Sequence, residues 1–153
     1  MNILLILIAL ILIPLLVLGI LRTIQTQNSS SQKLFLAGKI PSPKPDGSYK
    51  GSAGGRSDIA GWRGKKFDAT NSAGINLVGN SEKFPFKTYT GTGLADKDLQ
   101  VFKIDYDIPK NPFWLRLILD EIVETSPNHY LGKIHLKIIP GFPFSLGYFK
   151  LEK

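Results

Sequence analysis

The stretch "KNPFWLRLILDEIVETSPNHYLGK", residues 110–133, decides the fold because it sets charged side chains inside an aliphatic run. A strand over residues 115–123 has two largely apolar faces, since successive side chains of a strand point in opposite directions. One face carries Leu115, Leu117, Leu119, Glu121 and Val123, and the other carries Trp114, Arg116, Ile118, Asp120 and Ile122. A helix is the alternative, because Leu115, Ile118, Leu119 and Ile122 also have helical spacing. We favour the strand because a turn at residues 126–129 leads directly into a second alternating segment.

Similar alternation surrounds this stretch. The segments "LQVFKIDYD" (99–107), "YLGKIHLKI" (130–138) and "FSLGYFKLE" (144–152) alternate apolar and polar residues, which predicts strands. Shorter candidates are "GSYKGS" (47–52), "GWRGKKFDA" (61–69), "GINLV" (74–78) and "FPFKTYTG" (84–91). We therefore expect a mainly β domain, a single small antiparallel β-barrel of about eight strands, which closes to remove exposed edges. A split sandwich is the alternative.

The N-terminus carries 19 consecutive residues, 3–21, without a charged or hydrogen-bonding side chain. As a helix this run is about 28 Å long, close to the hydrocarbon thickness of a bilayer. A signal peptide is the competing interpretation, but no Lys or Arg precedes the run and no clear cleavage site follows it. We predict a single-pass transmembrane anchor over residues 1–21. Arg22 after the span favours a cytoplasmic domain.

Residues 22–45 are rich in Ser, Gln and Pro, which predicts a flexible basic tether before a barrel domain at 46–153. The tether contains Arg22, Lys33, Lys39 and Lys44 and no acidic residue, so it holds +4 of the net charge of +7. These charges fit either attraction to anionic lipid headgroups or a solvated linker.

Composition excludes several kinds of chemistry. The chain of 153 residues has no cysteine, which excludes disulfides, thiolate metal ligands and cysteine nucleophiles. Its two histidines, His129 and His135, lack the spacing of a metal site. Neither a nucleophile elbow nor an RNA-binding signature is present. We therefore predict no catalytic residues, no metal, no cofactor and no nucleic-acid partner.

Four motifs indicate a family. These are "PDGSYKGS" (45–52), "GWRGKKF" (61–67), "YLGK" (130–133) and the closing "FSLGYFKLE" (144–152). In patches over residues 45–153 the chain resembles the family named for its Gly-x-Trp-x-Gly motif, with the uncharacterised domain that follows it. Tyr49 replaces the motif's tryptophan, whereas Trp62 in the second motif is kept. The resemblance implies a lipocalin-like barrel without an established activity.

Aromatic side chains supply a candidate barrel lining: Trp62, Phe67, Phe86, Phe102, Tyr106, Trp114, Tyr130 and Phe144. A barrel of eight strands is either filled by side chains or holds one small ligand, and polar groups inside favour a ligand. The ligand-binding residues that we predict are Trp62, Phe102, Tyr106, Arg116, Asp120 and Tyr130. The apolar turn "IIPGFPF" (138–144) either contacts the bilayer or a partner, or is buried against the barrel end.

We thus expect a membrane-anchored, lipocalin-like protein that binds a small hydrophobic ligand or lipid without catalysis. One alternative is a membrane-tethered interaction or scaffold protein with a filled barrel. An enzyme of unknown class is the second alternative. A continuous internal cavity of about 300 Å³ or more would distinguish the first two.

Overall fold

The computed structural model describes residues 3–153, which form two helices and an antiparallel sheet. The helices are α1 (Ile3–Gln27) and α2 (Ser30–Ala37). The strands are β1 (Gly47–Ala53), β2 (Arg56–Ser57), β3 (Trp62–Asp68), β4 (Ala73–Val78), β5 (Ser81–Thr92), β6 (Gln100–Asp105), β7 (Ile118–Ser126), β8 (His129–Ile139) and β9 (Phe142–Glu152). Every strand that the sequence predicted from residue 47 onward is present.

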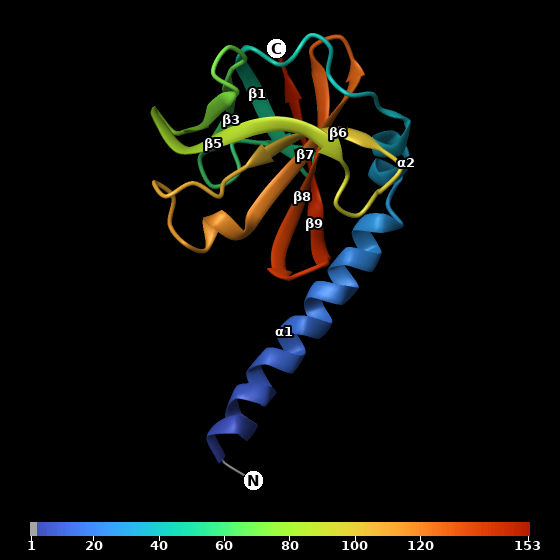
Figure 1. Ribbon diagram of the computed structural model, residues 1–153, viewed down its shortest axis with the longest axis vertical. Helices are drawn as coiled ribbons and strands as arrows, with labels where there is room; N and C mark the ends of the chain where they lie inside the picture. The colour runs from blue at the N-terminus through green and yellow to red at the C-terminus, as the bar shows by residue number, and fades with distance from the viewer. Residues whose placement is uncertain (1–2) are drawn as a thin grey trace.

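The sheet closes on itself. Neighbouring strands pair in the order β1-β3-β4-β5-β6-β7-β8-β9, and β1 also pairs with β9, where Gly51 lies opposite Leu151. This gives a closed barrel of eight strands, with the two-residue β2 attached to the end of β1 (Figure 1). The predicted antiparallel β-barrel is confirmed, and the split sandwich is wrong. Closure matters because it leaves the eight strands without an unpaired edge.

The stretch at residues 115–123 is a strand only from Ile118 onward. Residues 115–117 instead form one 3₁₀ turn, in which the Pro112 carbonyl accepts hydrogen bonds from the amides of Leu115 (3.0 Å) and Arg116 (3.3 Å). The strand prediction is therefore wrong for these three residues, because the chain is still turning after Pro112. The helical alternative for the whole segment is also wrong.

Both faces of β7 are buried, which explains its two apolar faces. Ile122 points into the barrel core, and Val123 belongs to an outer cluster beneath α2. The inner core consists of Tyr49, Phe67, Phe86, Phe102, Ile104, Tyr106, Ile122, Tyr130, Phe149 and Leu151. The outer cluster consists of Phe35, Val101, Val123 and Leu131. The barrel wall thus separates two apolar layers.

The predicted tether is wrong over residues 22–37, where the end of α1 and the whole of α2, joined by a two-residue turn, pack on the barrel. The hydroxyl oxygen of Ser29 accepts a hydrogen bond from the amide of Gln32 (3.2 Å) and caps α2 at its N-terminus. Phe35 is fully buried in the outer cluster. After α2, the chain pairs with β7, where the Lys39 amide donates to the Glu124 carbonyl at 3.0 Å. Burial of the Phe35 ring stabilises the packing of α2 on the barrel, although the helix also contains polar Ser and Gln residues.

Helix α1 is long and apolar enough to cross a membrane by length and composition, a test that a signal sequence also passes. Its N-terminal part projects away from the barrel (Figure 1). Its last turns are fixed to β9. The Arg22 side chain donates to the Leu146 carbonyl (2.6 Å), and the Ser145 amide donates to the Thr23 hydroxyl (3.0 Å). Helix and barrel are therefore joined by specific hydrogen bonds.

Candidate functional site

The barrel interior is filled in one half and hollow in the other. In the half near the β7–β8 turn, aromatic rings pack against each other. The ring centroids of Phe67 and Phe86 lie 5.5 Å apart, and those of Tyr49 and Tyr130 lie 5.2 Å apart. At the other end, where β3 begins and the β8–β9 turn lies, there is a pocket of about 380 Å³. We call this end the open end.

The pocket walls are mainly apolar and come from seven strands and two loops. The lining residues are Ala53, Ile59, Ala60, Trp62, Lys65, Asn76, Val78, Phe84, Tyr106, Leu115, Ile118, Asp120, Ile134 and Phe149. The Trp62 and Phe149 rings meet edge to face at 5.7 Å. Their packing leaves part of the Trp62 indole facing the pocket, because this side chain is only half-buried.

A buried ion pair forms the pocket floor. The Lys65 ammonium lies 3.1 Å from a carboxylate oxygen of Asp120 and donates to the Asn76 side-chain oxygen at 3.0 Å. It also donates to the Tyr106 hydroxyl. All four side chains are buried. Since an ammonium group has three N–H donors, these three contacts satisfy it completely.

Aromatic rings surround the Lys65 ammonium on the remaining sides. The nitrogen lies 5.1 Å from the centroid of Tyr106, 5.2 Å from that of Phe149 and 5.4 Å from that of Phe86. Distances below about 6 Å allow favourable cation–π attraction. The floor is thus a compact, neutral polar cluster inside an aromatic shell.

The titration behaviour of the floor follows from burial and pairing. Burial alone would lower the pKa of Lys65, but the charges and hydrogen bonds of Tyr106 and Asp120 outweigh burial and raise it. Burial, above all, raises the pKa of Tyr106 to about 12. Both pKa shifts move away from neutral pH, whereas a general acid or base works best with a pKa near the working pH.

Two irregularities in the strands place these side chains. The β3–β4 register shifts between Trp62 and Gly64, and this bulge turns both Trp62 and Lys65 toward the pocket. Gly64 has a φ of +138°, and a Cβ there would lie 1.9 Å from the Tyr49 carbonyl oxygen. Only glycine therefore fits the bulge. A second shift lies next to Asn76, whose side chain donates to the Phe84 carbonyl at 3.0 Å.

The structure brings together three of the six residues predicted to bind ligand. Trp62, Tyr106 and Asp120 line the pocket. Phe102 and Tyr130 lie in the filled core instead. Arg116 lies outside the barrel and pairs with Asp107 at 2.7 Å, with both side chains nearly half-exposed.

Two other predicted lining residues lie outside the barrel, and most of the pocket residues were not predicted, Lys65 among them. Trp114 is exposed, with its ring centroid 6.4 Å from that of Phe84. Phe144 packs against Gly19 of α1. Sequence reasoning missed Lys65. Its spacing of two from the apolar Phe67 places both on one strand face, which was the available signal.

A second buried polar cluster lies on the outer wall beneath the end of α1. His135 contacts a carboxylate oxygen of Glu121 at 3.1 Å and the Ser145 hydroxyl at 3.3 Å, and Lys103 lies 2.9 Å from the other Glu121 oxygen. The order Ser–His–Glu is that of a hydrolase triad. These three side chains are fully buried, however, and the Ser145 amide is bonded to Thr23. The cluster therefore holds α1 and the wall together rather than meeting a substrate.

Within residues 3–153, no group of three His, Asp or Glu side chains is arranged to hold a metal ion. No family model and no curated protein matches the chain. The relation to the Gly-x-Trp-x-Gly family stays a prediction. A solved structure described only as a protein from Thermomonospora curvata is similar, with a TM-score of 0.50 and 19% identity. The match covers 76% of this chain and 79% of that chain, and it supports the fold alone.

Proposed function

We propose that this protein is a membrane-anchored, lipocalin-like β-barrel that binds a small hydrophobic molecule or lipid without transforming it. The observation that carries the proposal is the 380 Å³ pocket with apolar walls over a buried polar floor. Its volume lies within the range of small-molecule sites, which are mostly apolar with a few fixed polar groups.

The polar floor indicates how a ligand enters. All three donors of the Lys65 ammonium are used by Asp120, Asn76 and Tyr106. An anionic headgroup would therefore find no free cation at the bottom of the pocket, and it would lose its hydration there. The ligand enters with its apolar part, and any charged part stays at the mouth.

The last turns of α1 favour an uncleaved anchor over a signal sequence. Arg22 and Thr23 are hydrogen-bonded to β9, and Thr26 is buried. Cleavage just after the apolar run would leave Arg22 as a charged chain end, and cleavage further along would remove the Thr23 hydroxyl that accepts from the Ser145 amide. The side of the membrane on which the barrel lies stays a prediction.

Two features argue for binding rather than catalysis. The pKa values of Lys65 and Tyr106 on the floor are shifted away from neutral pH. The Ser145–His135–Glu121 cluster is fully buried. The filled half of the barrel supports the alternative of a scaffold protein, which would need no ligand in the pocket.

Native mass spectrometry of the full chain, extracted in mild detergent, tests the proposal. We expect a co-purifying mass of a lipid or other small hydrophobic molecule. Ile118→Trp, which enlarges a side chain lining the pocket, should reduce its occupancy at least fivefold. Tyr89→Trp, on the exposed outer wall of β5, should not change it. A ligand-free wild-type protein, or equal occupancy in both variants, would favour the scaffold alternative.

A further inference from the structure

The direction of α1 relative to the barrel places the open end toward the apolar helix. Contacts pair Gly19 with Phe144, Thr23 with Ser145 and Arg22 with Leu146, so α1 and β9 run side by side in the same direction. The residues of α1 before Gly19 therefore extend past the beginning of β9. Figure 1 shows the β8–β9 turn and the projecting part of α1 at the same end of the molecule.

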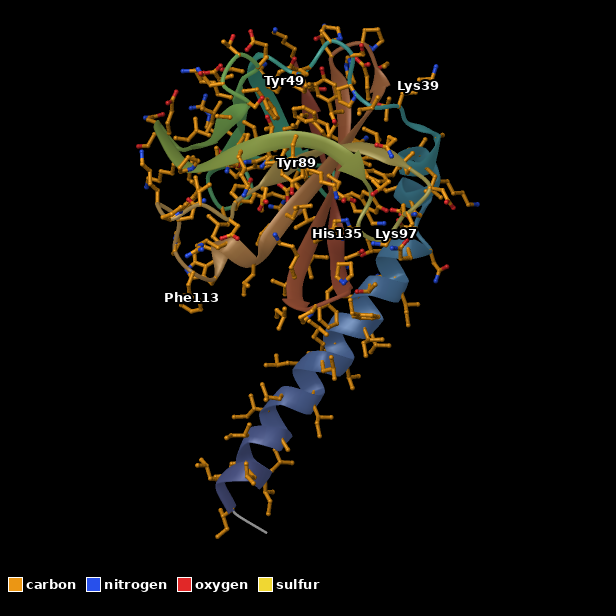
Figure 2. All side chains as sticks on the ribbon, viewed as in Figure 1. Lys39, Tyr49, Tyr89, Lys97, Phe113 and His135 are labelled. Carbon is orange, nitrogen blue, oxygen red and sulfur yellow. The ribbon has the colours of Figure 1, made fainter. Side chains whose placement is uncertain are left out.

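Large apolar side chains are exposed at this same end. Ile138, Ile139 and Phe142 belong to the β8–β9 turn region, and Phe113 and Trp114 belong to the β6–β7 loop. We call these five residues the apolar rim. Phe113 is 79% exposed and Trp114 is 53% exposed, and Figure 2 shows Phe113 at the lower left of the barrel, at the end toward which α1 projects. Exposed apolar side chains gathered at one end of a folded protein indicate an interaction surface, whereas single ones scattered over the surface are ordinary.

The apolar rim adjoins the pocket mouth. Trp114 contacts Phe84, which lines the pocket, and Leu115 and Ile118 continue the same loop into the pocket wall. On the other side, Ile134 lines the pocket four residues before Ile138 on the same strand. A surface that covers the rim therefore also faces the pocket.

Basic side chains accompany this end. Arg22 follows the apolar run of α1 directly, and Lys110 precedes Phe113 by three residues; both are exposed. Tryptophan and basic residues are enriched at the level of lipid headgroups, where Trp is half-inserted and cations contact phosphate. The chemistry of the rim matches a bilayer interface.

We infer that the apolar rim inserts into the same bilayer that α1 spans, so that the pocket opens toward the lipid and is loaded from it. This inference rests on the proposed membrane anchoring. It adds the partner of the rim, a lipid surface, and the route by which the ligand enters.

Depth-dependent fluorescence quenching tests this arrangement in full-length protein reconstituted into vesicles of phosphatidylcholine and phosphatidylglycerol. The chain has two tryptophans, so Trp62→Phe leaves Trp114 as the single probe. We expect lipids that carry a quencher high on the acyl chain to reduce Trp114 fluorescence at least twofold. For the control, Lys44→Trp in a chain that also carries Trp62→Phe and Trp114→Phe places the probe before β1, at the filled end. This control should be quenched by aqueous iodide and not by lipid.

The outcomes separate this inference from the proposed function. Trp114 quenched by iodide and not by lipid, in protein that resists carbonate extraction from the vesicles, overturns the rim inference and leaves the anchor intact. Trp114 quenched by lipid supports the inference, even where native mass spectrometry finds no bound ligand. Extraction of the protein by carbonate overturns both the anchor and the rim inference.

Discussion

The Lys65 ammonium and the Asp120 carboxylate, 3.1 Å apart, form an ion pair that is almost completely buried at the bottom of an apolar pocket. Two charges in such a place persist only because each compensates the other and both have further hydrogen-bond partners. The pair therefore determines both the stability of the barrel and the polarity of the pocket floor.

Single substitutions of this pair should be more harmful than the double substitution. Lys65→Met leaves the Asp120 charge buried without a cation, which typically costs about 3–5 kcal/mol. Lys65→Met combined with Asp120→Asn removes both charges and should unfold at a higher urea concentration than Lys65→Met alone. Urea denaturation followed by circular dichroism measures the difference. A double variant whose loss equals the sum of the two single losses would show that the residues are not coupled.

Acid should weaken the attachment of α1 through Glu121. Burial alone would raise the pKa of Glu121, but hydrogen bonds and charges from His135 and Lys103 outweigh it and lower the pKa below the ordinary 4.5. A lowered pKa in the folded state gives stability that is present above about pH 4.5 and lost as the pH falls through the folded value.

Glu121→Gln should therefore lower stability at pH 7 and flatten the pH dependence below pH 4.5. Thermal unfolding between pH 3 and 7 measures this effect. Glu82→Gln is the control, because Glu82 pairs with Lys66 on the exposed surface. Wild-type protein and Glu121→Gln with parallel pH profiles would argue against a role of this carboxylate.

Trp62→Ala should separate binding from stability. The indole is half-buried and faces the pocket, whereas Phe102 is buried in the filled half. Phe102→Ala should cost about 3–5 kcal/mol, and Trp62→Ala should cost less while reducing ligand occupancy severalfold. Urea denaturation and native mass spectrometry measure the two effects. Ligand occupancy of Trp62→Ala equal to that of the wild type would show that the indole does not contribute to binding.

Gly64→Ala should disrupt the barrel at the β3 bulge. The new Cβ would lie 1.9 Å from the Tyr49 carbonyl oxygen, which is part of the β1–β3 pairing and has little freedom to move. Gly54→Ala is the matched control, because Gly54 also has a positive φ but no atom within 4 Å of the added Cβ. We expect Gly54→Ala to lower the free energy of unfolding by about 1 kcal/mol, because alanine disfavours the positive φ at this position. Gly64→Ala should cost at least twice as much in urea denaturation, and equal losses would contradict the steric argument.

The strands were predictable because alternation reflects a barrel wall with one face inside. Residues 99–107 contain β6, and residues 130–138 and 144–152 lie within β8 and β9. Residues 115–117 were not predictable from alternation, because Leu115 and Leu117 continue the apolar pattern through a turn that Pro112 begins.

The candidate site was only partly predictable because a bulge interrupts the alternation of side chains between the two faces of a strand. Trp62 and Lys65 both face the pocket although their spacing of three places them on opposite faces of a regular strand. Helix α2 escaped prediction for a different reason. Its segment of eight residues is half polar, and contacts far apart in the sequence hold it in place. Phe35 packs with Val101, Val123 and Leu131, and the Gln32 side chain hydrogen-bonds to Asp96, Lys133 and Tyr148.

The contacts between the last turns of α1 and β9 limit how far the barrel can move away from the apolar helix. A flexible linker of 24 residues would extend up to about 80 Å and let the barrel visit an opposing membrane. Helix hydrogen bonds and the Arg22 and Thr23 contacts remove that freedom. Under the proposed anchoring, the barrel would therefore reach only the leaflet beside it and would not carry a ligand across an aqueous gap.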